Sequence, residues 1–372
     1  MQNTKENRSP AMDVIRCFAL LCVISVHFFT NSGFYMERID GPVMHLMTWM
    51  RASMMICVPL FLMLSGFLLA HKKPDKAYYG KSIKTIAIYL MASAVCMAYR
   101  RIFHSHSVDY SLHGALKALF GYSGAPYAWY VEMYLGLFLI IPFLNLCYCA
   151  VESKRGKQGL ILALFAISIL PNDVNAFVLS RASWWTNPAS SSDYFKILPS
   201  FWVDLYPIVY YFVGSYLREY PLKMKKDKHL ICILLVFVAA GMYNSYRCAG
   251  SAFIAGAWTG YGSTFVFIQS ILVFSYIQQC SFVWMSGWMK KLFARLSDAC
   301  LGAYLVSFVF DTRFYMILLE KVPTFRERLI WFPVVVLAVF VCSLLLSCVL
   351  TQFYNRCADL CVSRRKRKYG AD

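Results

Sequence analysis

The sequence is poor in charged residues and in the motifs of soluble enzymes. Only 15% of its 372 residues are charged, and only 19 are acidic, which is too few for the polar surface of soluble domains. It contains no C-x-x-C pair, no G-x-S-x-G turn, no H-E-x-x-H helix and no nucleotide-binding glycine loop. These absences argue against the common hydrolase, zinc and nucleotide-binding classes.

Apolar residues fill the chain instead. Hydrophobic residues make up 59% and aromatic residues 17%, and the apolar runs are about twenty residues long, the length of a membrane helix. They lack the alternation of barrel strands, so helices must satisfy the backbone in lipid. We therefore predict an all-α, polytopic membrane protein, a single domain over residues 1–372, with about ten transmembrane helices near 12–30, 44–70, 82–102, 127–150, 158–171, 203–219, 229–247, 261–280, 297–319 and 329–355.

The basic residues predict how the chain crosses the membrane. The net charge of +18 would suggest nucleic acid in a soluble protein, but here the basic residues lie in short loops, where they set topology. With the N-terminus inside, 23 basic residues lie in inner segments and 10 in outer ones. We therefore expect two cytoplasmic termini, a basic cytoplasmic tail at about 356–372, a location in the cell inner (plasma) membrane, and no nucleic-acid partner.

Two ionisable residues share one face of the first predicted span. Arg16 and His27 are eleven residues apart, which is almost three helical turns, so both leave the same stripe about 16 Å apart along the axis. Ionisable groups inside a span usually face a protein interior or a wet cavity. The structural alternative is an arginine that reaches lipid phosphates and a hydrogen-bonded core histidine.

Further stretches follow the Arg16–His27 pair in a recognisable order. They are VPLFLMLSGFLL at 58–69, WYVEMYLG at 129–136, YFVGSYL at 211–217, the segment 261–274 with Gln269 and Ser270, and LGAYLV at 301–306. Together they resemble the integral-membrane acyltransferase family three, which includes bacterial O-acetyltransferases acting on surface polysaccharides. The matches cover nearly the whole chain. Two departures are Ser307, where many members have histidine, and lysines at 81 and 84, where arginine is common.

The resemblance implies a membrane O-acyltransferase that moves an acyl group from cytoplasmic acyl-CoA to a hydroxyl of a cell-surface glycan or its lipid-linked precursor. The expected acyl group is acetyl. Acyl-CoA is then a co-substrate, and no permanently bound cofactor or metal is expected. His27 is the expected catalytic residue, either as general base or as acyl carrier, since both roles need a neutral imidazole. The expected donor-binding residues are Arg16, Lys81 and Lys84, and the residues that could bind the acceptor or support the site are Glu132, Trp129 and Tyr130.

The principal alternative is a proton-coupled secondary transporter with Arg16 and His27 in its pathway. No internal repeat is evident, which disfavours a transporter built from duplicated halves. Loop residues His104, His106 and Asp109 could ligate a metal, but no second-shell partner can be named for them, so we expect no metal site. The oligomeric state stays open.

Overall fold

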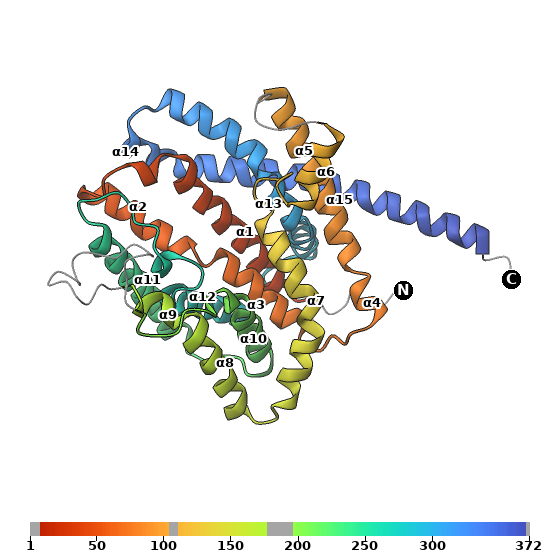
Figure 1. The fold of residues 1–372 in the computed structure, drawn as a ribbon, viewed down its shortest axis with the longest axis horizontal. Helices are drawn as coiled ribbons and strands as arrows, with labels where there is room; N and C mark the ends of the chain where they lie inside the picture. The colour runs from red at the N-terminus through yellow and green to blue at the C-terminus, as the bar shows by residue number, and fades with distance from the viewer. Residues whose placement is uncertain (1–7, 104–110, 177–195, 370–372) are drawn as a thin grey trace.

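The structure is a computed structural model that describes residues 8–103, 111–176 and 196–369, with side chains as far as residue 360. It is 79% helical without strands in the described part, so the all-α prediction is confirmed (Figure 1). The main helices are α1 (Pro10–Asn31), α2 (Gly41–Met54), α3 (Cys57–Leu69), α4 (Lys76–Tyr79), α5 (Ser82–Phe103), α6 (Leu112–Phe120), α7 (Trp129–Ala150), α8 (Lys154–Ser168), α9 (Leu170–Val174), α10 (Tyr206–Glu219), α11 (Lys226–Cys248), α12 (Thr264–Gln279), α13 (Gly287–Lys321), α14 (Phe325–Arg328) and α15 (Phe332–Tyr369).

Nine helical stretches in the described residues are long and apolar enough to cross a membrane. The predicted span at 203–219 corresponds to α10, which has 14 residues and is about 21 Å long, short of a hydrocarbon core of about 30 Å. Most of its residues are buried. A helix surrounded by other helices has no need to match the full lipid thickness, which explains how it can be short.

Helix α1 lies in the middle of the bundle and packs against α13, α3, α15 and α2. Of an 18-residue apolar stretch of this helix, 67% is buried. Small side chains such as Ala19 and Cys22 allow neighbouring helices to approach it on several sides. Helices α1 and α13 lie side by side, and two polar contacts join them, from Arg16 to Ser297 and from His27 to Asp311. Because the later residue of α1 meets the later residue of α13, the two helices run in the same direction.

Helices α3 and α10 cross at two glycines. A Cβ atom added to Gly66 would lie 1.9 Å from the carbonyl oxygen of Tyr211, and one added to Gly214 would lie 2.0 Å from that of Met63. Ser215 also donates a hydrogen bond to the Gly66 carbonyl across the crossing, at 3.2 Å. The glycines therefore allow the two backbones to touch and hold α3, which forms part of the cavity wall described below.

The described residues before α7, 111–128, lie back along α5. The Tyr89 hydroxyl donates to the Leu119 carbonyl at 2.7 Å, and Gly124 packs against Ser93. Since Ser93 lies ten residues, or about 15 Å, before the end of α5, the start of α7 lies well inside the bundle. This return brings Tyr127 and Trp129 to the site.

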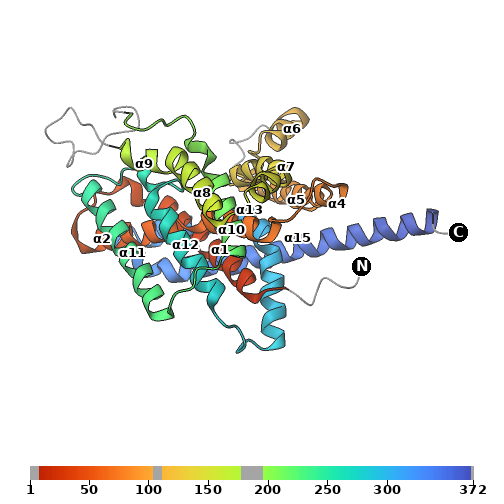
Figure 2. The same cartoon turned by 90° about the horizontal axis from the view of Figure 1, so that it is seen from below.

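Helix α15 is longer than the predicted last span. The C-terminal part of its 38 residues projects beyond the other helices (Figure 2). The predicted basic tail therefore begins as a continuation of this helix and not as a loop.

Candidate active site

A cavity of about 310 Å³ lies between α1, α3, α5, α7 and α13. Most of the area of its walls is apolar, from residues such as Val23, Val58 and Phe61. The polar side chains in its lining are Arg16, His27, Ser65, Lys84, Trp129, Tyr130, Tyr134, Tyr261, Ser297, Asp298 and Tyr304, together with Thr85 and the thiol of Cys300. The cavity thus joins both ionisable residues of the α1 stripe in one space.

The imidazole of His27 contacts the carboxylate of Asp311 on α13 through its Nδ1 atom. The distance from Nδ1 of His27 to Oδ2 of Asp311 is 2.9 Å, and the carboxylate is completely buried. A carboxylate can only accept, so Nδ1 carries the proton and Nε2 keeps its lone pair. His27 is therefore arranged to accept a proton at Nε2 from a group bound in the cavity.

Tyr127 completes this arrangement from the loop before α7. Its hydroxyl donates to the same Asp311 oxygen at 3.0 Å, and its ring centroid lies 4.1 Å from that of His27. Two donors thus satisfy one carboxylate oxygen of a buried charge, which is costly unless it is paired and hydrogen-bonded. The result is an imidazole fixed in both orientation and tautomer.

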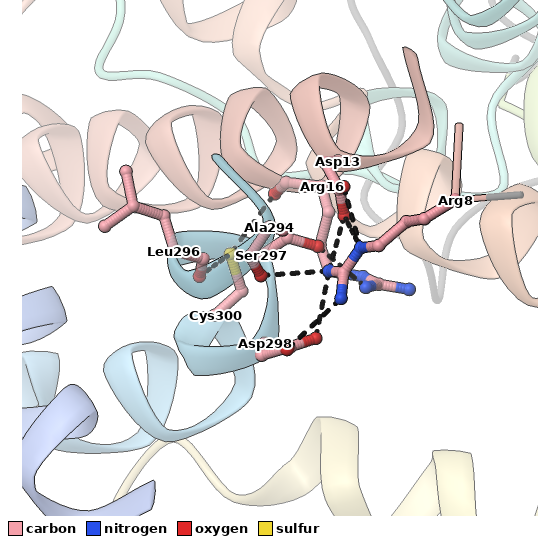
Figure 3. A network of polar contacts seen from close by, with 8 residues as sticks. All are labelled: Arg8, Asp13, Arg16, Ala294, Leu296, Ser297, Asp298 and Cys300. Atoms are coloured by element: carbon pink, nitrogen blue, oxygen red, sulfur yellow. Dashed lines mark hydrogen bonds and ion pairs between the residues drawn. The ribbon is translucent and has the colours of Figure 1, made fainter. Parts of the chain in front are cut away.

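A second polar network lies at the Arg16 end (Figure 3). Arg16 donates to the Ser297 hydroxyl at 2.8 Å. Arg8 binds Asp13 at 2.6 Å and Asp298 at 3.0 Å, so it ties the segment before α1 to α13. The hydrogen bonds to Asp13, and then those to Asp298, raise the pKa of Arg8 above its ordinary value, so this guanidinium stays charged.

Five of the seven predicted site residues line the cavity, namely Arg16, His27, Lys84, Trp129 and Tyr130. Lys81 and Glu132 do not line it, and both are exposed. Lys81 lies just before α5, one turn from Lys84. Glu132 lies on the first turn of α7, one turn from Trp129. The functional roles of all seven stay predictions.

Three residues of the site were missed in the sequence, namely Asp311, Tyr127 and Asp298. Asp311 lies inside the predicted span at 297–319, and the rule that singled out His27, an ionisable residue within an apolar run, would have found it. Tyr127 carries no such signal among the 25 tyrosines of the chain.

Ser307 stands where the resemblance described above leads us to expect a histidine. It is fully buried, and its hydroxyl donates to the Tyr304 carbonyl at 2.8 Å. Asp311 follows it by four residues on α13 and makes the contact with His27. Asp311, one turn after Ser307 on α13, thus supplies the carboxylate that contacts the His27 imidazole.

The comparison with known families agrees with this geometry. The family described as an acyltransferase domain matches residues 9–351. The chain belongs to this acyltransferase family. The resemblance to acyltransferase family three is thereby confirmed, and the match spans every element of the cavity of this acyltransferase, from α1 to α13. No curated protein and no solved structure matches the chain.

In the part of the chain that the structure describes, no three histidine, cysteine, aspartate or glutamate side chains are grouped as metal ligands would be. The loop residues His104, His106 and Asp109, considered above as metal ligands, lie outside the described residues.

Proposed function

We propose that this membrane acyltransferase is an inner-membrane O-acetyltransferase. It takes acetyl from cytoplasmic acetyl-CoA and places it on a hydroxyl of a cell-surface glycan or its lipid-linked precursor. The observation that carries the proposal is that one cavity holds the cationic Arg16 at one end and, at the other, the His27 imidazole hydrogen-bonded to Asp311. A family match to an acyltransferase favours this function over the transporter alternative.

The cationic end suits the donor. Coenzyme A carries several phosphate charges, and the cationic side chains of Arg16 and Lys84 both line the cavity. Charge-assisted hydrogen bonds from these groups would hold the phosphates, while the pantetheine arm lies along the apolar walls. The distance of about 16 Å between Arg16 and His27 along α1 suits an elongated donor that brings its thioester to the imidazole.

The imidazole end suits the chemistry. The acceptor hydroxyl attacks the thioester carbonyl and gives its proton to Nε2 of His27, and the carbon–sulfur bond breaks as the ester bond forms. The departing thiolate takes that proton, so the products are the ester and free coenzyme A. Asp311 stabilises the imidazolium that forms between these two proton transfers.

The test compares cells that express the wild type with cells that express His27→Ala, with glycan ester content measured by mass spectrometry. We expect the substitution to abolish the added ester, because a hydroxyl attacks poorly without a base. His45→Ala serves as the matched control, since His45 also lies on a membrane helix but does not line this cavity. Equal ester content in wild type and His27→Ala, at equal protein levels, would overturn the proposal.

A further inference from the structure

Trp129 connects the cavity with the outside of the bundle. It lines the cavity, yet 41% of its surface is exposed. Its indole stacks on Tyr261 with ring centroids 5.8 Å apart and an interplanar angle of 18°. One face of the indole is thus covered by Tyr261, so the side chain is a fixed part of the cavity wall. We infer an opening of the cavity where this wall residue is exposed.

Glu132 lies next to this opening. It follows Trp129 by three residues on α7, so the two side chains lie on the same side of the helix. Glu132 is exposed, and none of the ion pairs among the described residues includes it. A charged side chain on a spanning helix is costly against lipid, so this side of α7 needs water or a polar ligand.

The opening is also close to the reacting imidazole. Tyr127, whose ring lies 4.1 Å from that of His27, precedes Trp129 by two residues. Tyr130, the next residue of α7, lines the cavity and packs edge-on against Tyr304, with ring centroids 6.0 Å apart. A ligand resting on the free part of Trp129 would therefore lie against the same cavity that His27 lines.

We propose that Trp129 and Glu132 form the acceptor subsite and that it recognises an uncharged sugar ring. This inference rests on the proposed function and names the acceptor class more closely. The flat apolar indole suits the C–H face of a sugar, and the carboxylate can accept hydrogen bonds from two neighbouring hydroxyls. The same carboxylate repels a uronic acid, since like charges at an interface are disfavoured.

The test uses purified full-length protein in nanodiscs, radiolabelled acetyl-CoA, and two probe acceptors, octyl glucoside and octyl glucuronide, below their micellar concentrations. We expect the wild type to acetylate the glucoside and to prefer it to the glucuronide. Trp129→Ala should raise the KM for the glucoside about 3- to 10-fold, and Trp129→Phe should raise it less because a ring remains. Glu132→Gln should raise that KM about 10-fold and reduce the preference over the glucuronide.

The controls separate this subsite from the donor site and from folding. Trp202→Ala and Glu320→Gln change exposed residues that do not line the cavity and should leave the KM unchanged. Acetyl-CoA binding should be equal in all variants. Unchanged glucoside KM in Trp129→Ala and Glu132→Gln, or a wild type that acetylates neither glycoside, would overturn the subsite. The proposed function is judged separately, by the ester content of cells expressing His27→Ala.

Discussion

The reactivity of His27 depends on the carboxylate behind it. Asp311 is fully buried, and its Oδ2 accepts a hydrogen bond from Nδ1 of His27 at 2.9 Å, while its other oxygen has no hydrogen-bond partner among the described residues. A buried charge with so few partners is retained at a cost in stability. Its position against His27 accounts for that cost, because it fixes the tautomer that leaves Nε2 as the base.

Replacing the Asp311 carboxylate should slow the chemical step without changing the binding of acetyl-CoA. We expect Asp311→Asn to lower kcat about 10- to 100-fold, because the amide can hold the ring but cannot stabilise the imidazolium. Acetyl-CoA binding, measured by isothermal titration, should be unchanged. Ser307→Ala is the matched control, one turn earlier on the same helix, buried and without contact to His27. A kcat for Asp311→Asn equal to that of the wild type would exclude Asp311 from the reaction.

Arg16 is predicted to act at the other end of the cavity. Arg16→Ala should weaken acetyl-CoA binding by about 10-fold or more, since a hydrogen bond to a charged group contributes about 1.5–3 kcal/mol. Arg16→Lys should weaken it less, because the charge survives while the guanidinium fork is lost. Dephospho-CoA, tested alongside, shows whether the contact is to the ribose phosphate. Unimpaired binding in both variants would remove Arg16 from the donor site.

The contrast between Arg16 and Asp311 shows how far sequence reasoning reaches at single positions. Arg16 and His27 lie eleven residues apart on one helix, and helical periodicity alone predicts their shared face. The partner of His27 is 284 residues away, and only the packing of α13 on α1 brings it close. Lys81 and Glu132 were named from the stretches that resemble the family, but their exposure depends on the neighbouring helices and cannot be predicted from the sequence pattern.

Helix packing at the α3–α10 crossing offers a test that is independent of chemistry. Gly66→Ala would place a methyl group 1.9 Å from a backbone oxygen, and backbone cannot move aside as a flexible side chain can. We expect it to destabilise the protein by about 1–3 kcal/mol or more, seen as a lower Tm in detergent. Gly136→Ala on α7 meets nothing within 4 Å and should be neutral or slightly stabilising. Equal Tm values for the two variants would contradict the close crossing.

The helices themselves were predicted better than their interruptions. Apolar length located every long helix, from α1 to α15. The predicted span at 44–70 is instead two helices, α2 and α3, separated at Met55 and Ile56. The packing of residues 111–128 against α5, before α7 begins, was not predicted either. Hydropathy is an average over many residues, so it does not show that a helix begins or ends inside the bundle. These interruptions are what place α3 and Trp129 around the cavity.

The number of crossings decides whether the two termini lie on the same side of the membrane. Nine long helices alone would put the two termini on opposite sides, whereas ten crossings, with α10 included, put them on the same side. The basic residues favour ten, because 23 lie in the segments that would be inside and 10 in those outside. In that arrangement the Arg16 end of the cavity opens toward the cytoplasm, where acetyl-CoA is made.

Reporter fusions test this arrangement for the whole chain. We expect green fluorescent protein fused after residue 372 to fluoresce, since it folds only in the cytoplasm, and alkaline phosphatase fused after residue 256, between α11 and α12, to be active outside. A tag before residue 1 should be protected from protease in intact cells and cleaved after lysis.

An active phosphatase at the C-terminus, with the N-terminal tag still protected, would mean that α10 does not cross. The segments after it would then be inverted, although the Arg16 end of α1 would remain cytoplasmic. A cleaved N-terminal tag would instead turn Arg16 outward and exclude cytoplasmic acetyl-CoA as the donor at that end.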